Sequence, residues 1–173
     1  YDITLNIPRG GFAPIAVAED GTLFAGPANR GVWKRPPGSD GWMTTNLGTH
    51  SIKELWVNPS GRKIYALDET SILHVSLNGG NSWFDTSISL LSVAVGSEDH
   101  LVGISETSDL SESLNIVISE DSGQSWRVSN TIETGAYFDV IRVVASKDQP
   151  EMYYLVNGSL AKHSKDHGKT WRE

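Results

Sequence analysis

One eight-residue pattern returns three times along the chain and limits the fold more than any other feature of the sequence. Each copy begins with Ser, carries Asp or Asn two residues later, continues with Gly and then Ser or Thr, and ends in Trp. The last residues of the copies are Trp83, Trp126 and Trp171, and Trp42 precedes them, so the spacings are 41, 43 and 45 residues. Repeats of this length are typical of solenoids, propellers and arrays.

The same order of short apolar segments surrounds each copy of the pattern. In the second repeat, residues 52–57, 63–67 and 72–75 come before the pattern, and Trp83 opens a fourth segment. The segments are rich in Val, Ile, Leu and aromatic residues and are separated by Gly, Asp, Asn, Ser and Pro, which indicates four strands per repeat. No stretch has a sustained helical period.

The sequence therefore predicts an all-β fold, a β-propeller of four-stranded antiparallel blades with about four blades in this chain. We expect one domain over residues 1–173, with repeats at roughly 8–46, 47–87, 88–130 and 131–173. The first repeat is degenerate, because its turn at residues 36–41 lacks the acid and the Gly of the pattern and needs different chemistry.

The two ends of the sequence bear on how the sheets close. The fourth repeat stops at Trp171-Arg172-Glu173, where its last strand begins, and residues 1–7 form a strand-like segment without a repeat of its own. An unpaired sheet edge is an aggregation hazard, so residues 1–7 could supply the missing outer strand of a four-blade ring. The alternative is that the chain is part of a larger propeller. Because the sequence begins at Tyr1, we expect a processed form or a piece of a longer protein.

The repeated pattern has a structural explanation at every position. The Asp or Asn side chain can accept backbone N–H groups of a turn, the Ser can bond across it, the Gly permits positive φ, and the Trp buries a large apolar area. We therefore assign these residues to the turn between the third and fourth strands: Ser76, Asn78, Gly80, Trp83, Ser119, Asp121, Gly123, Trp126, Ser164, Asp166, Gly168 and Trp171.

The pattern resembles the Asp-box, or bacterial neuraminidase repeat, of sialidases, xyloglucan-type glycoside hydrolases, sortilin-like receptor domains and photosystem assembly factors. Two copies fit it fully, and the third carries Asn78 in place of Asp. The resemblance implies that the boxes lie at the periphery of the blades, away from the ligand-binding face. It also implies a secreted protein at an extracellular, cell-surface or periplasmic location.

Composition removes several classes of function. The net charge of −7 and the pI near 5.2 argue against nucleic acid or an anionic membrane as the main partner. No apolar run reaches the length of a membrane span, so we expect no membrane insertion. The chain has no Cys, hence no disulfide and no thiolate site. We expect no cofactor and no metal site. Of the five histidines, His163 and His167 flank one copy of the pattern, on a strand end and a turn and not on one helical face, which favours a solvated turn.

The sequence does not identify catalytic residues. A sialidase resemblance implies a set of three arginines, and nothing in the spacing of Arg9, Arg30 and Arg142 distinguishes them from surface residues. A xyloglucanase resemblance implies an Asp in the loop after the second strand, and residues 26–30 contain no carboxylate. The leading hypothesis is a non-catalytic, lectin-like module that binds a glycan or a partner protein. The alternatives are a glycoside hydrolase or a fragment of one, and a protein-only scaffold or assembly factor.

A ligand is expected on the face opposite the boxes. That face carries the turns between second and third strands and the links between blades, and loops of this kind often hold functional residues. Exposed aromatic side chains beside amides and acids suit sugars. The candidate ligand-binding residues are Phe12, Asn29, Arg30, His50, Asp68, Glu69 and Tyr137. We also expect that the chain could form a homo-oligomer or associate with further propeller blades.

Overall fold

The structure is a computed structural model that describes residues 13–97, 99–107, 113–133, 141–157 and 160–173. The described residues form fifteen β-strands joined by turns. Among them there is no helix with the length and hydropathy needed to cross a membrane. The chain divides into two compact units, Tyr1–Asp85 and Thr86–Glu173. The expectation of a single domain stays a prediction, and each unit is considered by itself.

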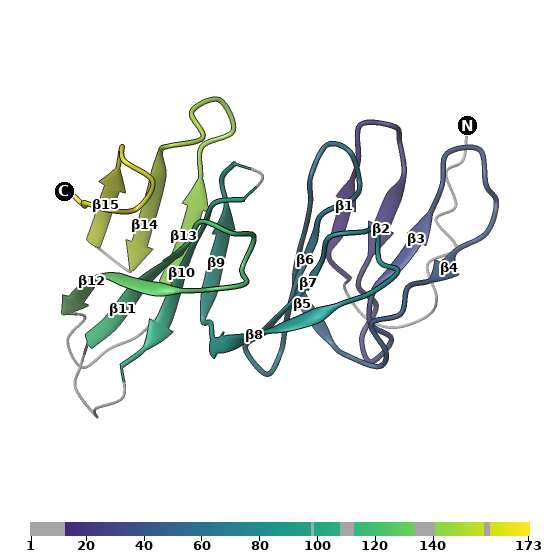
Figure 1. Cartoon of the computed structure of the whole chain (residues 1–173), viewed down its shortest axis with the longest axis horizontal. Coiled ribbons are helices and arrows are strands. Elements are labelled where there is room, and N and C mark those ends of the chain that lie inside the picture. Colours follow the sequence, from purple (N-terminus) through teal and green to yellow (C-terminus); the bar gives the residue numbers. More distant parts are fainter. Residues whose placement is uncertain (1–12, 98, 108–112, 134–140, 158–159) are drawn as a thin grey trace. The chain divides into compact units, whose positions relative to one another are not determined.

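The first unit holds two antiparallel sheets whose strands neighbour one another in sequence order (Figure 1). The strands of the first sheet are β1 (Ile15–Val17), β2 (Leu23–Ala25), β3 (Trp33–Arg35) and β4 (Met43–Thr44). Those of the second are β5 (Ile52–Val57), β6 (Ile64–Asp68), β7 (Ile72–Ser76) and β8 (Phe84–Ser89), and the boundary between the units falls within β8, after Asp85. The first strands of the two sheets, β1 and β5, contact each other.

The second unit repeats the same arrangement with one strand fewer. Its first sheet contains β9 (Ser92–Val95), β10 (Leu101–Glu106), β11 (Ser113–Ser119) and β12 (Arg127–Glu133). Its second contains β13 (Ile141–Ala145), β14 (Tyr153–Asn157) and β15 (Leu160–Ser164). Here too the first strands, β9 and β13, contact each other. The prediction of four-stranded antiparallel blades is confirmed. In the last blade only an isolated bridge between His163 and Arg172 stands where the fourth strand would run.

The middle strands are the most apolar because they are covered on both faces. Every residue of β6 is buried, and β10 is buried from Leu101 to Ser105. In β14, by contrast, buried and exposed residues alternate, as expected for a strand with one covered face. Each unit has its own apolar cluster, formed around Phe24, Ile52 and Ile64 in the first and around Ile104, Ile116 and Leu155 in the second.

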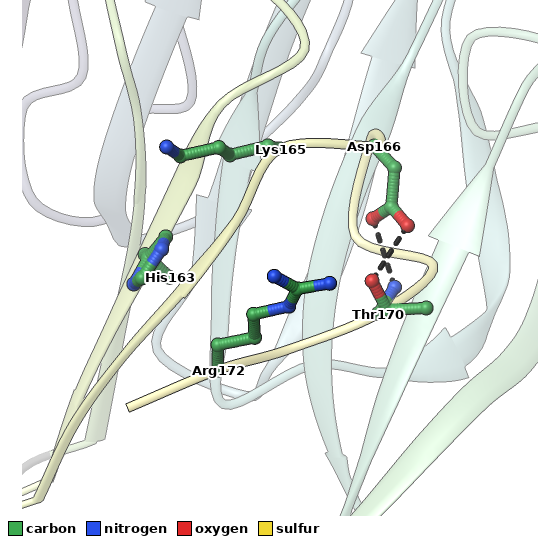
Figure 2. A pocket seen from close by; sticks show the side chains of 5 residues that line it. All are labelled: His163, Lys165, Asp166, Thr170 and Arg172. Atoms are coloured by element: carbon green, nitrogen blue, oxygen red, sulfur yellow. Dashed lines mark hydrogen bonds between the residues drawn. The ribbon is translucent and has the colours of Figure 1, made fainter.

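The repeated turns close each blade with a shared set of hydrogen bonds. In the last copy the Ser164 hydroxyl donates to Asp166 Oδ1 at 2.8 Å and accepts the Gly168 N–H at 2.9 Å. Thr170 donates its N–H to Oδ1 and its hydroxyl to Oδ2 of Asp166, at 2.8 and 2.7 Å (Figure 2). The copy at residues 119–126 makes the same four bonds through Ser119, Asp121, Gly123 and Ser125.

The copy with Asn78 keeps the geometry and reverses one bond. Asn78 Oδ1 accepts from the Ser76 hydroxyl at 3.1 Å and from the Ser82 N–H at 2.9 Å. Its Nδ2 then donates to the Ser82 hydroxyl at 2.7 Å, in the place where an aspartate oxygen would accept. A hydroxyl can serve as donor or acceptor, so Ser82 accommodates either residue.

The box glycines combine an unusual conformation with a close approach to the neighbouring blade. Gly80 and Gly168 have φ values of 85° and 80°. A Cβ on Gly168 would lie 2.8 Å from Val102, and one on Gly80 would lie 2.7 Å from Thr45. Both Val102 and Thr45 belong to the preceding blade. The glycine therefore allows the turn to rest directly on that blade.

The tryptophans of the pattern are half-buried and differ in their hydrogen bonding. Trp126 and Trp171 donate their indole N–H groups to the box glycine carbonyls at 3.1 and 3.0 Å. Trp83 and Trp42 have buried indole nitrogens without a hydrogen-bond partner among the described residues. Trp83 packs against the apolar cluster of the first unit and Trp171 against that of the second.

The turn before Trp42 uses different chemistry, as the sequence predicts. The Ser39 N–H donates to the Pro36 carbonyl at 3.2 Å, and the Gly41 N–H donates to the Ser39 hydroxyl at 3.3 Å. Arg35 lies over the Trp42 ring, 5.8 Å from its centroid. The segment at residues 1–7, expected to close the sheet edge, lies outside the described residues, so both modes of closure stay predictions.

Replacing Asp166 tests whether the box depends on charge or on geometry. Asp166→Ala removes the acceptor of three hydrogen bonds and should lower the free energy of unfolding by about 2–3 kcal/mol, at about 1 kcal/mol each. Asp166→Asn can make the bonds that Asn78 makes and should cost less than about 1 kcal/mol. Urea denaturation of both variants measures the difference, and equal losses would contradict this account.

Replacing Gly168 tests the close approach between blades. Gly168→Ala should destabilise the protein by roughly 2–4 kcal/mol, because it adds a steric clash to the cost of a left-handed backbone. The matched control is Gly48→Ala, since Gly48 has a φ of 88° with no atom within 4 Å of an added Cβ. It should cost only the conformational part, about 1 kcal/mol. Comparable melting temperatures for the two variants would exclude the packing contribution.

Candidate functional site

A cluster of polar side chains occupies one end of the first unit. Asp68 ends β6, whereas the box of the same blade begins at Ser76, the end of β7. The turn from β2 to β3 and the link from β4 to β5 reach the same end as Asp68, because the strands are antiparallel. The cluster therefore lies at the end opposite the box, where the sequence predicts ligand binding.

Asp68 is fixed by the turn that it begins. Its Oδ1 accepts the Thr70 N–H at 2.9 Å, the Thr70 hydroxyl at 2.7 Å and the Ile72 N–H at 3.0 Å. Only 3% of the residue is exposed. A short acid that bonds backbone groups two to four residues ahead is a common way to order a tight turn. Oδ1 is thereby occupied, and Oδ2 is the oxygen that faces other side chains.

Two histidines contact that second oxygen. His74 Nε2 lies 3.1 Å and His50 Nδ1 lies 3.3 Å from Asp68 Oδ2. The two imidazole rings are 4.2 Å apart between centroids and are tilted by 54°. The side chain of His74 is 1% exposed, whereas that of His50 is 37% exposed. The three ligand atoms lie within 4.8 Å of one another, a spacing and chemistry that can hold a metal ion.

His74 also has a partner on its other side. Its Nδ1 lies 2.6 Å from Oδ1 of Asp85, a residue of β8 whose side chain is 62% exposed. An oxygen at this distance requires a proton on Nδ1, so His74 donates to Asp85 and turns Nε2 toward Asp68. Asp85 thus sets the orientation of the buried ring.

The carboxyl of Asp68 is ionised at all ordinary pH values. Burial raises its pKa, but hydrogen bonds from Ile72 and Thr70 act in the opposite direction, and His74 adds a further bond and an electrostatic attraction. The net result is a pKa lowered from 3.8 to about 2. Asp68 is therefore suited to bind a cation or accept hydrogen bonds, and unsuited to donate a proton.

Ser51 connects the first blade to this cluster. The Asn29 N–H donates to the Ser51 hydroxyl at 3.0 Å, and that hydroxyl donates to Asn29 Oδ1 at 2.9 Å. The Ser51 carbonyl accepts the Glu69 N–H at 2.9 Å, and the His50 carbonyl accepts the Gly31 N–H at 2.9 Å. These bonds hold the turns of two adjacent blades side by side.

An aromatic ring borders the same turn. Trp33, the first residue of β3, is half-buried and donates its indole N–H to the Arg30 carbonyl at 3.0 Å. The bond fixes the ring beside the Asn29–Arg30 turn. The side chains of Asn29 and Arg30 in that turn are exposed, as is that of Glu69 in the turn between β6 and β7.

Five of the seven candidate residues lie at this end of the unit. Asn29, Arg30, His50, Asp68 and Glu69 belong to three neighbouring turns or links and are connected by the hydrogen bonds above. Phe12 and Tyr137, the other two candidates, lie outside the described residues. That these residues bind a ligand stays a prediction.

The sequence analysis missed four residues of the cluster: Trp33, Ser51, His74 and Asp85. His74 carried a usable signal, because it stands between Leu73 and Val75 in an otherwise apolar strand, and a buried polar group requires a partner. Its nearest candidate partner in sequence is Asp68, across the β6–β7 turn. Asp85 carried no such signal, since an exposed acid in a strand next to a turn is ordinary.

In the second unit, two hollows lie beside the repeated turns. One, of about 280 Å³, is lined by His163, Lys165, Asp166, Thr170 and Arg172 (Figure 2). The other, of about 180 Å³, lies at the equivalent box and includes Asp121, Ser125 and Trp126. Asp121 and Asp166 already accept the bonds that close their turns. The other charged residues of the hollows lie outside those bonds: Lys165 and Arg172 line the larger hollow, and Glu120 lines the smaller one and pairs with Arg127.

Comparison with known proteins identifies the fold. No family model and no curated protein matches the sequence. Among solved structures, an ancestral GH74 enzyme aligns over 94% of the chain with a TM-score of 0.71 and 20% identity. The GH74 xyloglucanase of Xanthomonas campestris aligns over 91% (TM-score 0.65, 20% identity), and YCF48 of Cyanidioschyzon merolae over 87% (TM-score 0.60, 15% identity).

The chain spans only part of each of these proteins. It covers 24% of the ancestral enzyme, 29% of the Xanthomonas enzyme and 49% of YCF48. At these identities the likeness concerns the backbone alone. Together with the four antiparallel sheets, it shows that this chain has the β-propeller fold, built of four-stranded blades.

Proposed function

We propose that the chain binds a glycan, without hydrolysing it, through the polar end of the first unit. The observation that carries the proposal is that the half-buried Trp33 is bonded to the turn that bears the exposed Asn29 and Arg30 side chains. The exposed Glu69 belongs to the next turn, and Ser51 bonds both turns. Sugars are bound by stacking on aromatic rings together with a few fixed polar groups. Here the backbone that bears the polar groups is held by the bonds of Ser51, so little order has to be gained on binding.

The fold likeness supports the choice of ligand class. Three GH74 enzymes, one described as a xyloglucanase, share the backbone arrangement of this chain. Xyloglucan and related β-glucans are therefore the first probes. We also propose, from the same likeness, that the repeated turns are Asp-boxes. The same likeness supports a location outside the cytoplasm.

A glycoside hydrolase, or a piece of one, is the second candidate, favoured by the same three neighbours. Hydrolysis ordinarily needs two carboxyl groups on either side of the scissile bond, one of them protonated. Asp68 has a pKa of about 2 and one oxygen occupied by its own turn, so it cannot be the acid. Glu69 is exposed beside it, and the turn at residues 26–30 offers no carboxylate. The remaining carboxyl group of the cluster, that of Asp85, already bonds His74. Among the described residues of this cluster, Glu69 therefore has no second free carboxyl group beside it, which supports binding over catalysis.

A matched pair of arginine variants tests the proposal. Arg30→Ala should weaken binding to soluble xyloglucan by about 10- to 150-fold in affinity electrophoresis, because a hydrogen bond from a charged group contributes about 1.5–3 kcal/mol. Arg62→Ala should leave binding unchanged, since Arg62 is equally exposed but lies at the box end of the unit. Equal effects of the two substitutions would contradict the assigned face.

The same samples separate the alternatives. If the protein releases reducing sugar from xyloglucan, and Glu69→Gln abolishes this release, the protein is a hydrolase and not a binding module. Absence of both binding and turnover over a panel of glycans, with a stable protein complex recovered in a pull-down, would favour a protein-only scaffold instead.

A further inference from the structure

We propose that His50, Asp68 and His74 form a binding site for a divalent transition-metal ion, best fitted by Zn²⁺. The ligands would be Nδ1 of His50, Oδ2 of Asp68 and Nε2 of His74. The proposal does not rest on glycan binding and concerns a site that sequence reasoning predicts to be absent, because its members are 18 and 6 residues apart on different strands and links.

The spacing of the three atoms fits a tetrahedral ion. Zinc binds imidazole nitrogen and carboxylate oxygen at about 2.0–2.2 Å, which places neighbouring ligands of a tetrahedron about 3.3 Å apart. The two nitrogen-to-oxygen distances are 3.1 and 3.3 Å. His50 Nδ1 and His74 Nε2 lie within 4.8 Å of each other. A rotation of the partly exposed His50 ring would bring these two nitrogens to the distance that a tetrahedral ion requires.

The hydrogen bond from His74 to Asp85 is the second observation that points to a metal. A histidine that binds a metal through one nitrogen usually donates the other N–H to a carboxylate, which fixes the ring. Asp85 fills this role for Nδ1, at 2.6 Å. Nε2 thereby faces Asp68 Oδ2 at 3.1 Å, and a cation between the two atoms would replace the hydrogen bond that joins them.

The ligand types select the ion and leave one position open. Two imidazoles with one carboxylate suit zinc and other late transition metals, whereas calcium and magnesium prefer oxygen ligands throughout. Three protein ligands leave the fourth position for water or an oxygen of a bound molecule. The 37% exposure of the His50 side chain gives the ion a route from solvent to the buried Asp68 and His74.

The experiment titrates the full chain, stripped with EDTA and dialysed, with ZnCl₂ by calorimetry and with CoCl₂ by visible absorption. The wild type should bind one Zn²⁺ per chain, show the absorption of tetrahedral Co²⁺, and melt at a higher temperature as Zn²⁺ is added. His50→Ala should abolish this binding, and its partly exposed position allows the variant to fold. Asp85→Asn should keep the ligands but weaken binding by about 10- to 100-fold.

Two further variants distinguish this site from nonspecific binding of Zn²⁺ by surface histidines. His163→Ala removes an imidazole of the second unit and should bind Zn²⁺ as the wild type does. Asp68→Asn keeps the oxygen that orders the turn and replaces the one that faces the histidines, so it should fold and lose the ion. A wild type that binds no Zn²⁺, or a His50→Ala variant that binds it undiminished, would overturn the proposal and leave the hydrogen bonds of His74 to Asp68 and Asp85 as the whole purpose of the cluster.

Discussion

Within each unit, the contact of one glycine of the repeated turns, Gly80 or Gly168, with the preceding blade is the interaction on which the packing of the two sheets depends. The Gly168 carbonyl accepts the Ser129 hydroxyl at 2.8 Å, and the Gly80 carbonyl accepts the Asn46 N–H at 3.1 Å. In both cases the donor belongs to the blade before. The turn that closes one sheet therefore also holds the next sheet in place, and this double use explains why its residues recur while the segments between them vary.

The end of each sheet that carries the repeated turn is stabilised by hydrogen bonds within that turn, so its polar groups serve the fold. Ser76, Ser119 and Ser164 are buried and their hydroxyls are used within the turn. At the other end of the first unit, Asp68 uses a similar kind of turn but keeps one oxygen for side chains outside it. An acid orders a turn at both ends of the sheet. At the end with the repeated turns its oxygens bond only within the turn, whereas Asp68 Oδ2 contacts side chains outside its turn.

Much of the fold could be predicted from the sequence, because the repeated turn marks both the period and the order of the strands. The candidate end could be predicted for a related reason, since antiparallel topology alone brings Asn29, His50 and Asp68 to the end opposite the boxes. What could not be predicted is how their side chains meet. The contact of His50 with Asp68 depends on how two blades pack, and the inward direction of His74 depends on strand register, which no spacing in the sequence expresses.

The reversed hydrogen bond of Asn78 bears on how such repeats are recognised. A search that demands an acid at this position finds two turns in the chain, although the backbone forms three alike, and a search that demands the whole pattern misses the turn before Trp42 as well. What the three turns that end at Trp83, Trp126 and Trp171 share is a pair of acceptors and a glycine at fixed offsets from the tryptophan, not a charge. Blade counts derived from acidic motifs alone are therefore lower limits, and the shortfall grows as the copies diverge.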